Sequence, residues 1–143
     1  MKPGFASTGK ISPQLLMALC LCDASEIMAL PCSGAANCGQ IANELALRLR
    51  DDGKATPYCT VGIGGHVKGI VEGARSARLL LALDGCNVAC ARKCLEGEGL
   101  GPGMHFIVAD EIKMKKDHVR AKEGDITKAY GMLVRKLDAV TGK

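Results

Sequence analysis

The 143-residue sequence contains no tryptophan and only two tyrosines and two phenylalanines. So few aromatic rings provide no platform on which nucleic-acid bases could stack, and nucleic-acid binding is unsupported. The sequence also lacks an apolar run of the ~18 residues that a membrane helix needs, so we expect no membrane association. It has neither a serine–histidine–acid arrangement nor a nucleophile elbow, which leaves hydrolytic catalysis without candidate residues. Whether the chain catalyses another reaction stays open.

An export signal is also missing in any clear form. Two lysines in residues 1–10 precede a short apolar stretch, residues 15–22, but no small-x-small cleavage site follows it cleanly. We therefore expect a cytoplasmic protein with reduced thiols. The net charge of +4 arises towards the C-terminus, where residues 111–143 hold nine basic and five acidic side chains. This excess is typical of a solvated helical face.

Cysteine, in contrast, is abundant, with eight in the chain. A single domain of this length buries roughly 70% of the surface that its unfolded chain exposes, so it needs no metal merely to fold. Eight thiols are also more than a core of this size uses as small apolar fillers. A disulfide framework would require an oxidising compartment, which the absence of a clear export signal argues against. The cysteines therefore point to binding or to thiol chemistry.

Short apolar runs alternate with segments of helical periodicity along the chain. The expected strands are residues 27–31, 55–60, 79–83 and 105–109, and the expected helices are residues 39–50, 67–77, 88–96 and a last helix opening near Asp125. In the last helix we expect five buried residues, Ile126, Tyr130, Leu133, Leu137 and Val140. This alternation predicts a single small α/β domain with a mainly parallel four-stranded sheet and helices on both faces. We assign residues 26–143 to this domain and residues 1–25 to an N-terminal segment that carries Cys20 and Cys22.

Cysteines lie just beyond three successive predicted strands. Cys32 follows the first strand, Cys59 closes the second and Cys86 follows the third. The carboxyl ends of parallel strands lie along one edge of a sheet, where ligands bind, so these three thiols are expected to meet there.

Two more cysteines, Cys90 and Cys94, follow Cys86 at fourfold spacing, as on one face of a helix. Neighbouring turns are about 5.4 Å apart, so Cys86 and Cys90 can hold one ion, whereas Cys94 is too far from Cys86 to join them. We expect Cys86 at the start of this helix, where free amides and the helix dipole favour a thiolate. A thiolate serves equally as metal ligand and as nucleophile.

Each of the remaining cysteines has two alternative roles. Cys38 lies in the turn that enters the first helix and is either a ligand or helix-start packing, and Cys20 and Cys22 form a pair that binds a metal or fills the core. Asp84 either orients the ligands by accepting hydrogen bonds from them or is a helix cap or turn residue. The glycine-rich segment 62–65 is expected to be a tight turn, and the three histidines are expected at the surface or in turns, although His66 lies near Cys59 in sequence.

Several motifs in fixed order resemble a known family. They are Pro31-Cys32-Ser33-Gly34, Gly39-Gln40-Ile41-Ala42-Asn43, Tyr58-Cys59-Thr60-Val61-Gly62-Ile63-Gly64-Gly65 and Ala82-Leu83-Asp84-Gly85-Cys86 followed by Cys90-Ala91-Arg92-Lys93. Together they resemble the DGC-domain family, whose members are regarded as zinc-binding. The similarity extends from about Cys20 to Cys94 and implies four zinc ligands without implying an activity.

Carried over by position, the four implied ligands are Cys32, Cys59, Cys86 and Cys90, the set that the strand ends and the helical spacing also select. Cys38 occupies a position where the family has no cysteine, and Cys20 and Cys22 match a leader that some members carry. We therefore predict a Zn²⁺ protein with a structural, storage or delivery role, with the metal ion as its partner and a protein partner unidentified. Two alternatives stay open: a thiol redox or sulfur-transfer protein with Cys86 as nucleophile and Cys90 as resolving thiol, and an iron–sulfur cluster protein.

Overall fold

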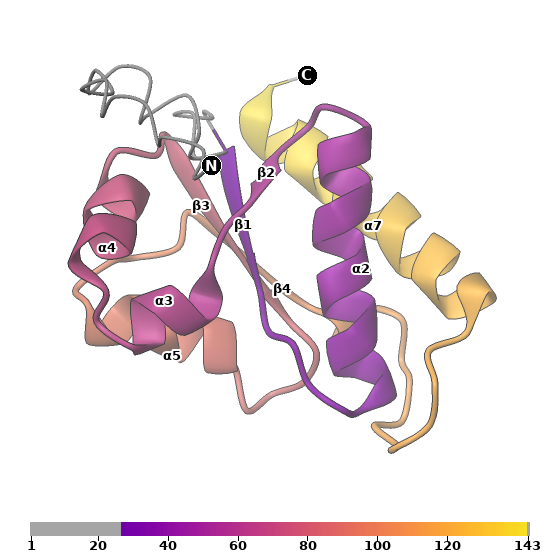
Figure 1. Ribbon diagram of the computed structural model, residues 1–143. Helices are drawn as coiled ribbons and strands as arrows, with labels where there is room; N and C mark the ends of the chain where they lie inside the picture. Colours follow the sequence, from indigo (N-terminus) through magenta and orange to yellow (C-terminus); the bar gives the residue numbers. More distant parts are fainter. Residues whose placement is uncertain (1–26, 143) are drawn as a thin grey trace, which may run out of the picture.

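Four apolar segments form a sheet in which every strand is parallel to its neighbours (Figure 1). The computed structural model describes residues 27–142. Its strands are β1 (Ile27–Pro31), β2 (Thr56–Pro57), β3 (Leu79–Asp84) and β4 (Met104–Ile107), in the order β2-β1-β3-β4. The helices are α2 (Asn37–Asp51), α3 (Thr60–Gly64), α4 (Lys68–Arg75), α5 (Cys90–Gly97), α6 (Val108–Glu111) and α7 (Glu123–Thr141). The predicted α/β class, parallel sheet and helices on both faces are confirmed.

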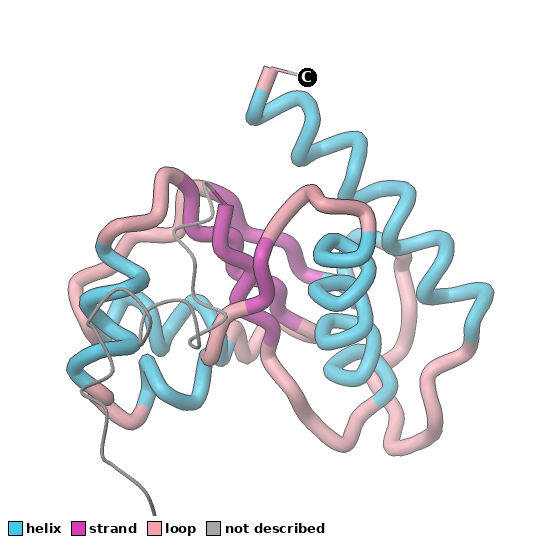
Figure 2. The backbone as a smooth tube through the Cα atoms, turned by 45° about the horizontal axis from the view of Figure 1, so that its top comes forward, coloured by secondary structure: helices cyan, strands magenta, loops and turns pink. Residues whose placement is uncertain are grey.

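The helices form one layer on each side of the sheet (Figures 1 and 2). Because successive side chains of a strand point to opposite faces, Ala29 and Leu81 pack towards α2 and α7. Their neighbours Met28, Leu80 and Ala82 pack towards α3, α4 and α5. The central strands β1 and β3 are thus buried on both faces, as their continuous apolar sequences require. None of the helices in residues 27–142 is long and apolar enough to span a bilayer.

The connections of β1 and β3 leave the sheet in opposite directions. β1 leads through α2 to β2 at one edge, whereas β3 leads through α5 to β4 at the other edge. Right-handed crossovers that run in opposite directions place their helices on opposite faces. A crevice therefore opens between the carboxyl ends of β1 and β3, at the point where the strand order reverses.

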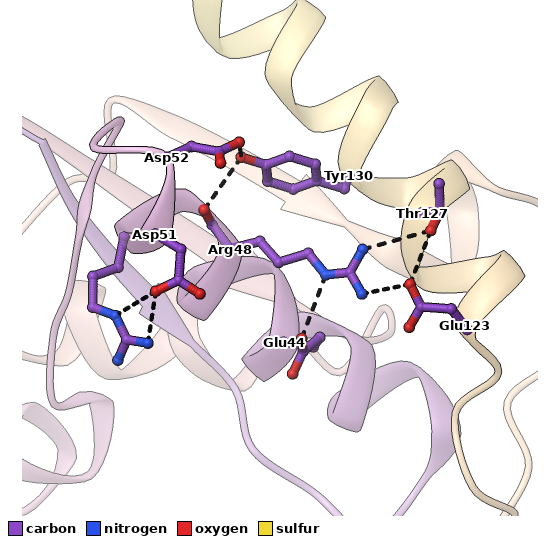
Figure 3. Close-up of polar contacts among 8 residues, drawn as sticks. Glu44, Arg48, Asp51, Asp52, Glu123, Thr127 and Tyr130 are labelled. Carbon is purple, nitrogen blue, oxygen red and sulfur yellow. Dashed lines mark hydrogen bonds and ion pairs between the residues drawn. The ribbon is translucent and has the colours of Figure 1, made fainter.

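Polar side chains join α2 to α7 along what we call the α2–α7 seam (Figure 3). The Arg48 guanidinium donates to the Glu123 carboxylate at 2.6 Å and to Glu44 at 3.4 Å. The Tyr130 hydroxyl lies within hydrogen-bonding distance of the Arg48 carbonyl and of an Asp52 carboxylate oxygen. These contacts join segments about 80 residues apart in the sequence and fix α7 against α2.

Two predicted strands are too long and one predicted turn is a helix, because two short helices that were not predicted begin there. Strand β2 ends at Pro57, and the glycine-rich segment expected as a turn forms α3, whose first residue Thr60 donates its hydroxyl to the Pro31 carbonyl at 2.8 Å. Strand β4 ends at Ile107, where α6 begins. These short helices close the ends of strands whose apolar sequences continue past the last sheet pairing.

The last helix also differs from the prediction. Helix α7 begins at Glu123 and Lys122 is its N-cap, so Asp125 lies inside the first turn instead of capping the helix. Leu133 and Leu137 are buried as expected, but Val140 is 54% exposed and Tyr130 is only half-buried. Val140 lies in the final turn of α7, where the helix extends past the layer formed by α2.

Candidate functional site

A cavity of about 420 Å³ lies where the carboxyl ends of β1 and β3 separate. All six cysteines of the described residues line it, and none of them forms a disulfide; they are Cys32, Cys38, Cys59, Cys86, Cys90 and Cys94. We call this space the cysteine cavity. Cys20 and Cys22 lie outside the described residues. The parallel topology therefore brings together thiols that are up to 62 residues apart in the sequence.

The segment from Cys86 to Cys90 is not helical, contrary to the prediction. Cys86 lies in the turn after β3, and α5 begins only at Cys90. Ala89, the N-cap of α5, has a left-handed backbone with φ of 54°, a conformation that a side chain disfavours by about 1–2 kcal/mol. This bend interrupts the helix that the fourfold spacing indicated. The positive end of the α5 dipole consequently faces Cys90 and not Cys86.

Cys32 occupies the inner part of the cavity. Its Sγ accepts a hydrogen bond from the Gly85 amide at 3.0 Å. The pKa of the Cys32 thiol is raised to about 11, mainly by burial; the Gly85 amide lowers it, and the negative charges of Asp84, Cys90 and Cys86 add to the rise. A cation is therefore needed to hold this thiol as a thiolate at neutral pH. The same interactions identify Cys86 and Cys90 as neighbours of Cys32.

Cys59 and Cys94 both contact α3. Cys59 is the N-cap of this helix, and its Sγ accepts a hydrogen bond from the Gly62 amide at 3.3 Å. Cys94 approaches the same helix from α5, since a Cβ added at Gly64 would lie 2.9 Å from the Cys94 Sγ. Both sulfurs thus lie against the short glycine-containing helix α3.

Lys116 and Cys38 lie on the other side, beside Cys86. The Lys116 ammonium is 3.5 Å from the Cys86 Sγ and stabilises negative charge there. Cys38, in the first turn of α2, is 1% exposed; burial raises its pKa, Cys86 raises it further and Lys116 lowers it. The cysteine cavity therefore contains a cation as well as thiols.

The loop that carries Lys116 is held in place by an amide side chain of α2. Asn37, which is buried, accepts from the Asp117 amide at 2.9 Å and donates to the Lys115 carbonyl at 3.1 Å. The backbone N–H of Asn37 also donates to the Asp117 carbonyl at 2.8 Å. Sequence analysis missed Lys116 and Asn37, because no periodicity connects residues 78 to 80 positions apart. The basic character of residues 111–143 was the only available signal.

Asp84 is a fully buried carboxylate that holds the first turn of α5. It accepts hydrogen bonds from the Ala91 amide at 2.8 Å, the Arg92 amide at 3.1 Å and the His105 ring at 2.9 Å. Asp84 thus fixes the orientation of Cys90, the residue just before Ala91. His105, expected at the surface or in a turn, lies instead in β4 with a side chain that is 19% exposed. Of the other histidines, His66 pairs with Glu98 and His118 is exposed.

Gly85 permits the close approach of β3 and α2 beneath the cavity. A Cβ added at Gly85 would lie 2.6 Å from the Gly39 nitrogen and 2.7 Å from the Cys38 carbonyl carbon, both of them backbone atoms that cannot move aside. The three residues Asp84, Gly85 and Cys86 therefore have distinct roles. Asp84 fixes α5, Gly85 brings the end of β3 against α2, and Cys86 supplies a thiol to the cavity.

The thiols line the same cavity, but they are not arranged around one common metal position. Within residues 27–142, no group of three cysteine, histidine, aspartate or glutamate side chains is already spaced to hold an ion. The donor set nevertheless fits a soft ion, because thiolates are preferred ligands of zinc and the helices α2 and α5 direct their N-termini to this edge. The role of the four predicted ligands stays a prediction, as does that of the additional thiols.

Comparisons with known proteins agree with the motif pattern. The family model described as DGC domain matches residues 28–133. The chain is also similar to the anaerobic and virulence modulator AnvM of Pseudomonas aeruginosa, with 41% identity over 85 residues. That match covers 59% of this chain and 65% of the relative, slightly less than two thirds of its length. No solved structure matches this chain.

Proposed function

Because this chain belongs to the DGC-domain family, we propose that it is a cysteine-rich protein that binds zinc in the cysteine cavity. The four proposed ligands are the thiolates of Cys32, Cys59, Cys86 and Cys90. The single observation that carries the proposal is that all four line one cavity at the carboxyl edge of the sheet. Zinc bound by four thiolates has no open coordination position, so it supplies cross-linking of the fold or a transferable ion in place of a reactive water.

The electrostatics of the cavity support this assignment. One Zn²⁺ with four thiolates has a net charge of −2, which an enclosed site must offset. Lys116, 3.5 Å from the Cys86 Sγ, and the N-terminus of α2 provide positive charge there. The charge of the bound Zn²⁺ also explains how Cys32, whose pKa is raised mainly by burial, becomes a thiolate ligand.

The half-exposed character of the ligand set favours storage or delivery. Cys59 and Cys90 are exposed, whereas Cys32 and Cys86 are partly covered. Exposed ligands allow an acceptor thiol to replace them one at a time. We further propose that this chain acts in the reducing cytoplasm, where thiols stay reduced, and that it delivers the metal to a protein partner, as yet unidentified.

Metal analysis combined with thiol counting tests the proposal. The full chain is purified under reducing conditions without added metal, and its zinc content and thiol reactivity are measured before and after chelation. We expect at least one zinc per chain and at least four thiols that react only after chelation. Cys86→Ser should hold at least one zinc fewer per chain than the wild type, whereas the matched variant Ser33→Ala, at an exposed position lining the same cavity, should hold the same amount. A brown protein with broad visible absorbance would instead identify an iron–sulfur cluster.

One contact favours the thiol redox function as a second candidate. The Lys116 ammonium beside Cys86 stabilises the thiolate of a nucleophile as well as that of a ligand. In this function Cys86 attacks a substrate disulfide, one substrate thiol leaves, and Cys90 displaces the second thiol by forming a disulfide with Cys86. A protein that carries no zinc and whose Cys86 forms a mixed disulfide with oxidised glutathione would support this function over zinc binding.

A further inference from the structure

Two thiols of the cysteine cavity have no part in the four-thiolate site. Cys38 and Cys94 line the same space as the four proposed ligands. They enter it from different helices, α2 and α5. The cavity volume of about 420 Å³ is also much larger than one ion requires, since a water molecule has a share of about 30 Å³ in the liquid. Both observations indicate capacity beyond a single ion.

The six sulfurs divide into two outer pairs. Cys38 interacts with Cys86, and both lie beside Lys116. Cys59 and Cys94 form the second pair, because both sulfurs contact α3, at Gly62 and Gly64 respectively. The outer pairs thus lie against different elements, the first turn of α2 and the helix α3.

Cys32 and Cys90 connect the two pairs within the same cavity. Cys32 interacts electrostatically with Cys90 and also with Cys86, a member of the first pair. Cys90 interacts in the same way with Cys94, a member of the second pair. Each of these two thiols therefore interacts with the other and with one member of an outer pair.

We propose that the cysteine cavity binds two zinc ions, with Cys38 and Cys86 on one ion, Cys59 and Cys94 on the other, and Cys32 and Cys90 bridging both. This inference rests on the proposed zinc binding. Two tetrahedral ions require eight sulfur positions, and six thiolates supply them when two of the thiolates are shared. Two Zn²⁺ with six thiolates have a net charge of −2, the same as one Zn²⁺ with four, so Lys116 and the N-terminus of α2 offset both equally. The arrangement also keeps Cys86 and Cys94 on different ions.

Native mass spectrometry of the full chain, saturated with zinc under anaerobic reducing conditions, counts the ions directly. The expected result is two zinc ions per chain in the wild type and one in Cys94→Ser. Cys38→Ala should also hold one, and it provides a second variant in case Cys94→Ser fails to fold, which circular dichroism detects. Ser33→Ala and the double variant Cys20→Ser/Cys22→Ser should both retain two.

The other results overturn the inference in distinguishable ways. One zinc in the wild type, unchanged in Cys94→Ser and Cys38→Ala, rejects the second ion while the four-thiolate site stands. No zinc in the wild type rejects the proposed function as well. Two zinc ions that persist in both variants, or a second ion lost in Cys20→Ser/Cys22→Ser, reject the assignment of the second ion to this cavity.

Discussion

The cysteine cavity and the α2–α7 seam both assemble side chains from distant parts of the chain, but only the seam completes its interactions internally. In the seam, Arg48 is paired with carboxylates on both helices, and Tyr130 reaches acceptors on α2 (Figure 3). In the cavity, Cys32 and Cys59 each accept an amide hydrogen bond and Cys86 lies beside an ammonium, but none of the six described cysteines is paired in a disulfide. The difference separates residues that stabilise the fold from residues that remain available to a ligand.

The buried polar groups beneath the cavity resemble those of the seam, because their hydrogen bonds are also completed within the protein. No buried side-chain nitrogen or oxygen in residues 27–142 lacks a hydrogen-bond partner. The Asp84 carboxylate accepts three hydrogen bonds and holds α5 in place. The protein thus surrounds soft, available sulfurs with a rigid and fully paired frame, as pre-organised metal sites require.

Gly85→Ala is expected to have the largest effect, because it breaks the frame under the cavity. The added Cβ would overlap backbone atoms of Cys38 and Gly39, which should destabilise the protein by about 3 kcal/mol or more. Denaturant unfolding measures this change. Gly34→Ala is the matched control, since its added Cβ meets nothing within 4 Å and Gly34 lines the same cavity. Equal stabilities of the two variants would contradict the close approach.

Asp84→Asn should weaken both the frame and the site. The amide cannot accept from the amides of Ala91 and Arg92 as a carboxylate does, so we expect a loss of about 2 kcal/mol in stability and a reduced zinc affinity. Chemical unfolding and competition with a chelator measure the two effects. Asp110→Asn, at an exposed carboxylate paired with Asn87, should change neither by a comparable amount. An unchanged zinc affinity in Asp84→Asn would show that the α5 turn does not position a ligand.

Lys116→Met should separate binding from stability. Removing the ammonium beside Cys86 leaves the thiolate charge less well offset, so zinc affinity should fall roughly tenfold, or about 1.4 kcal/mol. The melting temperature without metal should hardly change, because Lys116 is exposed. Lys113→Met, an exposed lysine at the start of the same loop, serves as the control. A tenfold loss in both variants would indicate general electrostatics in place of a specific contact.

Glu123→Gln should have the smallest effect, and only on the seam. The hydrogen bond from Arg48 is the main cause that holds the pKa of Glu123 below its ordinary value of 4.5. A carboxyl whose pKa is lowered on folding adds stability above its unfolded pKa, and this stability is lost as the pH falls through the folded value. Glu123→Gln should therefore melt slightly lower than the wild type at pH 7 and equally at a pH below both values. The zinc content of Glu123→Gln should stay unchanged. A loss of zinc would contradict the claim that the seam and the cavity have separate roles.

The sequence allowed prediction of the features that follow from local patterns. Strand β1 was predicted with its observed bounds and β3 within one residue, because continuous apolar runs have few alternatives in a buried parallel sheet. The α/β class and the gathering of thiols at one sheet edge follow from the order of these elements. The positions of Cys32 and Cys86 after neighbouring strands are direct consequences.

Features that depend on distant contacts or unusual backbone were not predicted. The left-handed Ala89 delays α5 to Cys90, although the fourfold cysteine spacing is typical of an uninterrupted helix. Lys116 lies beside Cys86 in a loop that is held by Asn37, a residue almost 80 positions earlier in the chain. The bond between Asp84 and His105 likewise joins two strands whose sequences reveal no polar pairing.

X-ray absorption spectroscopy at the zinc K-edge tests the central claim most directly, because it identifies the atoms bound to the metal. For zinc in the purified full chain, the cysteine cavity predicts a first shell of about four sulfurs at about 2.3 Å, without nitrogen or oxygen ligands. The same spectrum should appear in Ser33→Ala, whereas the zinc content per chain should fall in Cys86→Ser. A shell of nitrogen and oxygen at about 2.0–2.1 Å, or a zinc content unaffected by Cys86→Ser, would contradict the account.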